Sequence, residues 1–356
     1  MKKAFSFILI AVTLAFPLAS FAQKGSFAEI KQLQSPQDPK LGFMIHGGAD
    51  VMSKAQMTPA KEKELRAKLE EVVLAGYKAL QDGRSSVEAV ELAIRMMEDS
   101  PLFNAGKGAA FTHDGKNELE SSIMDGKTMA AGATAGLRHI KNPITLARAE
   151  MERSTDLMMM GDGAEQFAKE QKVELVEEKY FWTQERWAAL QQVLKEEKLP
   201  LPEKKVMTSG GPASKGTGNG LGAVGAVALD KKGNLASGTS TGGMTNKKYG
   251  RVGDTAIIGA GTFANNDSCA VSGTGSGDNF IRLSIARDIG AMMEYRALPV
   301  QQAADLVIQQ KLKSIGGEGG VIAMDKFGNM AISFNTEGMY RAYIGADGKP
   351  IVEIYK

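Results

Sequence analysis

The sequence predicts an α+β fold in which layered antiparallel sheets are covered by helices. Two observations support this prediction. Helical patterns lie before and between groups of short apolar segments that are typical of strands, and a strict alternation of strand and helix is absent. The second observation argues against a doubly wound parallel sheet. A chain of 356 residues has room for one large domain or two ordinary ones.

The first half of the chain is expected to contain one buried strand and four helices. The strand is an apolar run that ends at Gly47 and Gly48. Helices are indicated by apolar residues at helical spacing and by capping residues, such as Ser85 followed by Glu88 in a capping-box pattern. The expected elements are a strand over 41–46 and helices over 59–82, 85–99, from the Asn142-Pro143 cap onward, and 183–197.

Residues 200–221 form a linker, and the chain after it is rich in strands. The linker contains prolines, lysines, serines and glycines, a composition typical of flexible, exposed segments. It ends where an apolar run begins at Val224, and a mobile segment next to a buried strand suits a site of chain cleavage. The expected later elements are turns at 230–234, 325–329 and 347–348, and helices over 279–293 and 300–313.

Residues 1–22 are typical of a secretory signal peptide. Lys2 and Lys3 precede an apolar stretch over 5–18 that is too short to span a membrane. Small residues at 20–22 fit a cleavage site, so we expect the mature chain to begin at Gln23. A short membrane anchor is the alternative. Elsewhere no apolar run approaches ~20 residues, so we expect an exported, periplasmic protein with no membrane contact after signal removal.

Composition argues against several classes of function. The 43 basic and 41 acidic residues leave a net charge of +2, and no basic stripe with interleaved aromatic residues is visible, so a nucleic-acid partner is not expected. Cys269 is the only cysteine, which excludes an internal disulfide. The three histidines, at 46, 113 and 139, form no metal-ligand pair, so neither a zinc enzyme nor a catalytic cofactor is expected.

The most specific part of the sequence lies between residues 222 and 282. Taken singly, its motifs have ordinary explanations as a packed strand entry, a solvated turn, a surface ion pair and a tight turn. The motifs are Gly222-Ala223-Val224, Thr239-Ser240-Thr241-Gly242-Gly243, Gly250-Arg251-Val252-Gly253-Asp254 and Thr274-Gly275-Ser276-Gly277. Together they resemble the start of the catalytic subunit of plant-type L-asparaginases, also called isoaspartyl aminopeptidases. These are N-terminal nucleophile hydrolases of the threonine type.

The resemblance extends over about residues 42–355 and implies a four-layer αββα sandwich built as one folded unit. It also implies a precursor that is cut between Gly222 and residue 223. The products are an alpha segment, 23–222, which includes the linker, and a beta segment, 223–356. Two precursors are expected to form a homodimer, which becomes a dimer of heterodimers after cleavage. The motifs His46-Gly47-Gly48-Ala49 and Asn335-Thr336-Glu337-Gly338-Met339-Tyr340-Arg341 complete the match. A further motif, Met244-Thr245-Asn246-Lys247, favours the plant-type branch over glycosylasparaginases.

In such enzymes the nucleophile is a threonine at the position of Ala223. A threonine hydroxyl is a poor nucleophile unless a base accepts its proton. The α-amino group that cleavage frees, with an ordinary pKa of about 7.7–8.0, supplies that base. A preceding glycine lets the backbone bend and the hydroxyl approach, and Gly222 fits this role. Ala223 has only a methyl group, so we expect an uncleaved precursor whose turnover is lower on the order of a millionfold.

The resemblance implies roles for further residues at the same site. Thr241 orients the nucleophile, and Thr274 with Gly275 forms the oxyanion hole. A guanidinium and a carboxylate suit the two charged groups of an aspartyl substrate, which assigns its α-carboxylate to Arg251 and its α-ammonium group to Asp254.

Three further assignments also follow from the resemblance alone. Gly277 contacts the substrate, and a loop places Asn104 near the nucleophile. The same loop binds a structural sodium ion through backbone carbonyl groups, because hard cations prefer oxygen ligands. The matching carbonyl positions are Met97, Glu98, Ser100, Phe103, Ala105 and Lys107.

With a threonine at 223, the expected activity is hydrolysis of β-aspartyl dipeptides and L-asparagine. Two alternatives remain open. One is a non-catalytic binding protein that holds an aspartyl ligand, and the other is a glycosylasparaginase-like amidase with a preference for a bulky leaving group. Ala223 is either the natural residue of a binding protein or a residue introduced into an enzyme, and the sequence is compatible with both.

Overall fold

The computed structural model describes residues 33–36, 40–49, 54, 57–202 and 222–356. The expected signal peptide and the linker from residue 203 onward lie outside these residues. Within the described part of the chain, no helix is both long enough and apolar enough to cross a bilayer.

Two sheets stack face to face between two layers of helices, as the αββα prediction requires. The larger sheet has the order β13-β12-β2-β6-β7-β3-β4-β5, and the smaller has the order β1-β11-β10-β9-β8. Neighbouring strands are antiparallel except β4 and β5. The strands of the larger sheet are β2 (Gly42–Gly48), β3 (Leu119–Asp125), β4 (Ala131–Leu137), β5 (Met158–Met160), β6 (Val224–Leu229), β7 (Leu235–Thr241), β12 (Gly338–Ile344) and β13 (Pro350–Tyr355). Those of the smaller sheet are β1 (Leu33–Gln34), β8 (Thr262–Ala264), β9 (Cys269–Gly275), β10 (Gly319–Asp325) and β11 (Asn329–Phe334).

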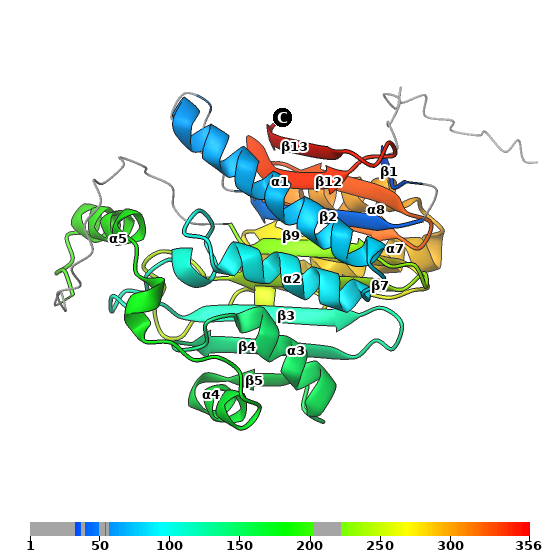
Figure 1. The fold of residues 1–356 in the computed structure, drawn as a ribbon. Coiled ribbons are helices and arrows are strands. Elements are labelled where there is room, and N and C mark those ends of the chain that lie inside the picture. The colour runs from blue at the N-terminus through cyan, green and yellow to red at the C-terminus, as the bar shows by residue number, and fades with distance from the viewer. Residues whose placement is uncertain (1–32, 37–39, 50–53, 55–56, 203–221) are drawn as a thin grey trace, which may run out of the picture. The chain divides into compact units, whose positions relative to one another are not determined.

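Helices cover the outer face of each sheet. Figure 1 shows α1 (Pro59–Gln81), α2 (Ser86–Glu98) and α3 (Pro143–Arg153) crossing the larger sheet. On the smaller sheet lie α6 (Gly277–Leu283), α7 (Ile285–Arg296) and α8 (Val300–Asp305). Helix α4 (Gly161–Glu170) packs beside β4 and β5, and α5 (Gln184–Glu196) follows it in the chain.

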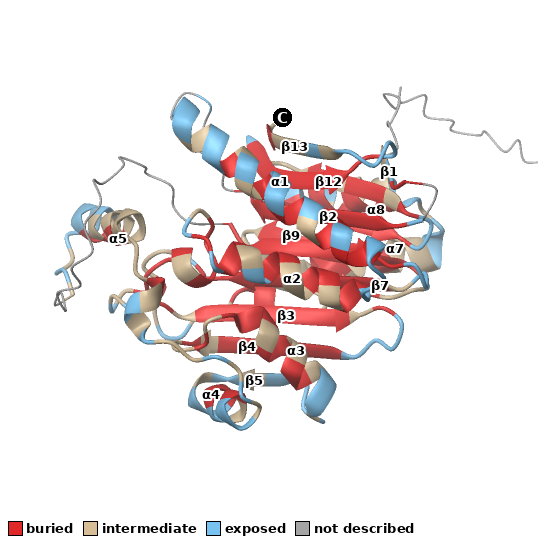
Figure 2. Ribbon diagram, viewed as in Figure 1, coloured by how far each residue is buried: buried red, intermediate tan, exposed pale blue. Residues whose placement is uncertain are grey.

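Apolar side chains fill the spaces between these layers. One core cluster joins α1 and α2 to the larger sheet, and a second lies between the two sheets and under α7 and α8. Figure 2 shows the consequence: the inner strands of the larger sheet are buried, the edge strands β5 and β13 are partly exposed, and α1 has one buried and one exposed face. Burial explains why β2 was visible in the sequence as an apolar run, whereas β3, β4 and β5 were not predicted.

Most of the predicted elements are confirmed. Thr58 caps α1, and Ser85 and Glu88 make both hydrogen bonds of a capping box at α2. The turns at 230–234 and 325–329 join antiparallel strand pairs, as expected. Strand β2 continues through Gly47 and Gly48, so the prediction that these glycines end it was wrong.

Three predictions about helices need correction. The segment 279–293 is two helices, because Ser284 adopts a left-handed conformation with φ of 49° between α6 and α7. The segment 300–313 changes at Leu306 from α8 into a wider π-type helix, Leu306–Leu312. Asn142 stands at the start of α3, but its side chain donates to Asp99 and does not cap the helix.

Candidate active site

Residue 223 stands at the entry to β6 and is held by groups from both sheets. Its N–H donates to Thr274 Oγ1 of β9 at 3.1 Å, and its carbonyl oxygen accepts from His46 Nδ1 of β2 at 3.1 Å. The Ala223 side chain is buried, with 6% exposure. The position assigned to the nucleophile is therefore fixed in space although the nucleophile itself is missing.

The residue before it makes an unusually close backbone approach. A Cβ atom added to Gly222 would lie 2.9 Å from the Cα of Gly48. A Cβ added to Gly48 would lie 2.8 Å from the Cα of Gly222, and Gly48 has a φ of 116°. Two glycines are needed here because each of these backbone segments leaves no room for a side chain on the other. This contact explains Gly222 and Gly48, whereas a Cβ added to Gly47 would lie 2.7 Å from the ring of Phe103.

A small pocket brings together most of the residues predicted for the site. Its lining residues are Ala223, Thr241, Gly243, Met244, Arg251, Gly253, Asp254, Thr255 and Gly275. The open space is about 20 Å³. That is room for about one water molecule.

The charged end of the pocket is built by Arg251 and Asp254. Burial raises the pKa of the Asp254 carboxyl to about 7, and the nearby Glu120 carboxylate acts in the same direction. Among the described residues, Asp254 Oδ2 has no hydrogen-bond partner. Arg251 Nη2 and Nε donate to Asp278 Oδ1 at 2.8 and 3.2 Å, and Asp278 is largely exposed. A buried carboxylate oxygen without a donor is the feature that an ammonium group would satisfy.

Gly277 lies against this charged pair. A Cβ added there would lie 2.8 Å from Asp254 Oδ1 and 2.9 Å from Arg251 Nη2. Glycine is required because any side chain would displace both charged groups. The structure thus places Gly277 beside the pocket, although it is absent from the lining residues.

Thr241 and Asn104 both hold the turn that closes the pocket. Thr241 Oγ1 accepts from the N–H of Gly243 at 3.1 Å. Asn104 Nδ2 donates to the Gly243 carbonyl at 2.7 Å, and its Oδ1 accepts from the N–H of Ala110 at 2.8 Å. The Asn104 side chain is buried and does not line the pocket. These two hydrogen bonds are those of a residue that shapes the turn.

Comparison with known proteins decides the family. A family model described as "Asparaginase" matches residues 39–354. The chain belongs to the asparaginase family. It is 47% identical over 317 residues to an isoaspartyl peptidase of Escherichia coli (strain K12), covering 89% of this chain and 97% of the relative. It is 39% identical over 324 residues to a probable isoaspartyl peptidase/L-asparaginase 2 of Arabidopsis thaliana, covering 88% and 98%.

This asparaginase-family chain contains a buried ion pair that sequence reasoning missed. Lys247 Nζ lies 3.2 Å from Glu120 Oε1, and both side chains are almost fully buried. Glu120 Oε2 also accepts from the N–H of Gly253 at 2.9 Å, between Arg251 and Asp254. The pair therefore anchors the loop that carries the charged end of the pocket. Lys247 stood in a recognised motif, but nothing in the sequence linked it to Glu120.

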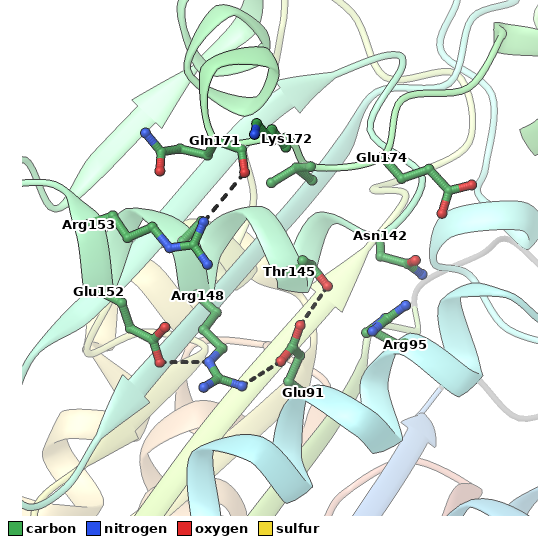
Figure 3. Close-up of a pocket in the computed structure, with 12 residues that line it drawn as sticks. Glu91, Arg95, Asn142, Thr145, Arg148, Glu152, Arg153, Gln171, Lys172 and Glu174 are labelled. Atoms are coloured by element: carbon green, nitrogen blue, oxygen red, sulfur yellow. Dashed lines mark hydrogen bonds and ion pairs between the residues drawn. The ribbon is translucent and has the colours of Figure 1, made fainter.

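A larger opening, of about 370 Å³, lies apart from these residues, between α2 and α3. Figure 3 shows that two of its acidic side chains have partners: Arg148 donates to Glu91 and Glu152, and Thr145 donates to Glu91. The third, Glu174, accepts from Lys141. None of the residues assigned to the asparaginase site lines it. Size alone is therefore a poor guide to the active site in this protein.

Proposed function

We propose that this chain is the precursor of an isoaspartyl peptidase/L-asparaginase and that Ala223 keeps it uncleaved and inactive. The observation that carries the proposal is the buried, unpartnered Asp254 carboxylate oxygen beside Arg251, in the pocket that begins at residue 223. An aspartyl group has a carboxylate for Arg251, an ammonium for Asp254 and a side-chain carbonyl for the nucleophile. The similarity to an isoaspartyl peptidase and to a probable isoaspartyl peptidase/L-asparaginase supports this substrate class.

With threonine at 223, the site residues support an acyl-transfer mechanism. The hydroxyl oxygen attacks the side-chain carbonyl carbon of the substrate, and the α-amino group of residue 223 takes the hydroxyl proton. Thr274 and Gly275 stabilise the oxyanion. The scissile C–N bond breaks, and the departing amine or ammonia takes up the proton. Water then hydrolyses the ester by the reverse proton route, which releases aspartate and restores the threonine.

The same hydroxyl would also cut the chain before residue 223. Attack on the carbonyl carbon of Gly222 transfers the alpha segment to the hydroxyl oxygen and frees the α-amino group, and water completes the cleavage. Gly222 and the adjoining Gly48 both lack a side chain, so neither residue places one next to the scissile carbonyl. Ala223 supplies no attacking atom, so neither reaction begins.

We also propose that the loop over 97–107 binds a structural sodium ion. Within the described residues no group of three histidine, cysteine or acidic side chains could hold a metal ion, so carbonyl oxygens would have to do so. A Cβ added to Gly106 would lie 2.3 Å from the Glu98 carbonyl oxygen, and one added to Gly108 would lie 2.1 Å from that of Phe103. The glycines thus let carbonyl groups converge, which fits a cation held by backbone oxygens. The remaining carbonyl positions are those of Met97, Ser100, Ala105 and Lys107.

Export and assembly belong to the same proposal. The basic and apolar start of the chain supports removal of residues 1–22 in the periplasm. The homodimer rests on family resemblance. A non-catalytic aspartyl-binding protein is the rival; it would use the same Arg251 and Asp254, so only the response to a hydroxyl at residue 223 separates the two.

The deciding experiment restores the hydroxyl. Ala223→Thr should split between 222 and 223 and release aspartate from a β-aspartyl dipeptide, as followed by intact mass and product analysis. Ala223→Val is the matched control, because valine has the shape of threonine without its hydroxyl. A threonine variant that stays whole and inert, while the alanine chain binds aspartate in calorimetry, would establish the binding protein instead.

A further inference from the structure

His46 holds the backbone of residue 223 at the point where strand pairing ends. The registered pairs of β6 reach Gly225 opposite His46 on β2, and Val224 opposite Ser240 on β7. Residue 223 precedes both of these pairs, so it is paired with neither β2 nor β7. Its carbonyl oxygen instead accepts from His46 Nδ1 at 3.1 Å. A side chain therefore provides at this position the kind of hydrogen bond that a neighbouring strand provides along the rest of β6.

The chemistry of the contact fixes the state of the imidazole ring. A carbonyl oxygen only accepts, so Nδ1 must carry the hydrogen. Burial lowers the pKa of His46 to about 3, so the ring is neutral and Nε2 carries none. Nε2 is therefore an acceptor, and Ser272 Oγ lies 2.8 Å from it and 3.1 Å from the Gly238 carbonyl oxygen. The ring is thus held at both nitrogen atoms.

Three further hydroxyl groups continue this chain of hydrogen bonds between the sheets. Thr239 Oγ1 lies 2.8 Å from Ser272 Oγ and 2.6 Å from Thr262 Oγ1, and Ser122 Oγ lies 2.8 Å from Thr262 Oγ1. We call these four residues the hydroxyl seam; all are fully buried, and they come from β3, β7, β8 and β9. Backbone carbonyl oxygens also accept from the seam: Thr239 Oγ1 donates to Gly261 at 3.1 Å, and Ser122 Oγ donates to Thr255 at 2.5 Å. The seam is therefore tied to the backbone as well as to His46.

Gly225 makes room for this arrangement. A Cβ added there would lie 2.0 Å from Ser272 Oγ and 2.4 Å from His46 Nε2. The hydrogen bond between those two atoms therefore passes directly over the backbone of β6. Any side chain at 225 would break it. This glycine had no explanation in the sequence beyond tight packing.

Stability alone gives little reason to bury these groups. Buried polar groups add only modest net stability even when they are hydrogen-bonded, and apolar residues of similar size often serve a core as well. What a satisfied network does provide is one defined geometry. We propose that His46 and the hydroxyl seam are positioning residues: they hold the carbonyl of residue 223, and so fix the direction of the side chain that the nucleophile occupies.

The first test uses the chain with Ala223 and needs no activity. His46→Leu removes the donor, whereas His46→Asn keeps an N–H near the place of Nδ1. We expect amide hydrogen exchange at residues 223–225 to become at least tenfold faster in His46→Leu and to change little in His46→Asn. Exchange in β12 serves as the internal reference. Equal protection of 223–225 in all three proteins would overturn the proposal.

The second test rests on the proposed function and uses the Ala223→Thr background. Since small misplacements of reacting groups cost up to about a hundredfold, we expect His46→Leu to lower kcat by about 10–100-fold per processed chain with KM within about twofold. His46→Asn should recover most of the loss. A merely structural role would lower the melting temperature and the folded fraction but leave kcat per processed chain unchanged.

Ser272→Ala decides the matter if His46→Leu does not fold. This change keeps the His46 ring and removes only the hydroxyl that hydrogen-bonds its Nε2, so we expect kcat to fall about 3–10-fold with the KM unchanged. An unaltered kcat would overturn the role of the seam. If Ala223→Thr is itself uncleaved and inert, the proposed function fails, and the hydrogen-exchange comparison still tests the positioning of residue 223.

Discussion

The two ends of the pocket are built from opposite kinds of groups. Around residue 223 all contacts are neutral: the Thr274 hydroxyl, the uncharged His46 ring and the glycines. Around Asp254 the groups are charged and coupled, with Glu120 paired to Lys247 and Arg251 paired to Asp278. The neutral end fixes one direction for an attacking atom, whereas the charged end recognises an ion pair on the substrate.

Under the proposed function, this difference would let an alanine at 223 remove the attacking hydroxyl without disturbing the rest. A methyl group in a neutral region leaves no uncompensated charge, and the backbone of residue 223 keeps both of its hydrogen bonds. A change at the charged end alters several partners at once, because buried charges depend on one another. The predictions below test whether the two ends act separately, on turnover and on recognition.

The largest effect is expected at the neutral end. Ala223→Thr should raise turnover of a β-aspartyl dipeptide on the order of a millionfold over the alanine chain, because it restores the attacking atom. The measurement is the rate of aspartate release beside intact mass. Ala223→Val should match the alanine chain in both readouts. Activity in the valine variant would show that the hydroxyl of residue 223 is not the nucleophile.

The next effect belongs to Asp254. In the Ala223→Thr enzyme, Asp254→Asn should lower kcat/KM by about 10²–10³-fold, since an ammonium group loses a buried carboxylate partner worth about 3–5 kcal/mol. With a pKa raised to about 7, Asp254 ionises across neutral pH, so kcat/KM should rise as pH increases through about 7. A flat profile from pH 6 to 8 would contradict this assignment.

Ionisation of Asp254 should raise kcat/KM but lower the stability of the folded protein. Its folded-state pKa lies above its ordinary value of 3.8, so the folded chain binds more protons than the unfolded chain between those values. The stability of the parent should therefore fall as pH rises from about 4 to 7. Asp254→Asn should remove this loss and raise the free energy of unfolding at pH 8 by roughly 1–3 kcal/mol, as measured by urea denaturation.

A smaller effect is expected from the ion pair behind the charged end. Glu120→Gln keeps an acceptor for the N–H of Gly253 but loses the charge that faces Lys247. We expect KM to rise about 3–10-fold with kcat within about twofold, because the loop that carries Arg251 and Asp254 loosens. Equal changes in kcat and KM would show that the two ends are not separate.

The smallest effect should come from Glu98, which is buried beneath the site. Burial raises its pKa to about 8, and its Oε1 accepts from Ser240 Oγ and from the N–H of Ile144. Glutamine offers the same acceptor without a proton to lose. Glu98→Gln should therefore change stability by less than about 1 kcal/mol at pH 7. Above pH 8 it should be the more stable protein, because ionisation of a buried carboxyl with a raised pKa destabilises the parent.

The sequence predicted residues at both ends of the pocket but not the distant contacts that hold them. Gly222, Thr274 and Gly275 lie in short contiguous motifs, and so do Arg251 and Asp254. The Glu120–Lys247 pair and the His46–Ser272 contact join residues 127 and 226 positions apart. Such pairings depend on strand register, which local patterns do not specify. The break at Ser284 was missed for a related reason: its left-handed conformation has no local signature in a non-glycine residue.

The strand order of the larger sheet bears on what happens after the chain is cut. Strand β2 comes from the alpha segment and lies between β12 and β6 of the beta segment, while β7 of the beta segment pairs with β3 of the alpha segment. Three strand boundaries therefore cross from one fragment to the other. A break in the peptide at residue 222 is not a break in the sheet, so the two polypeptides would separate only by unfolding together.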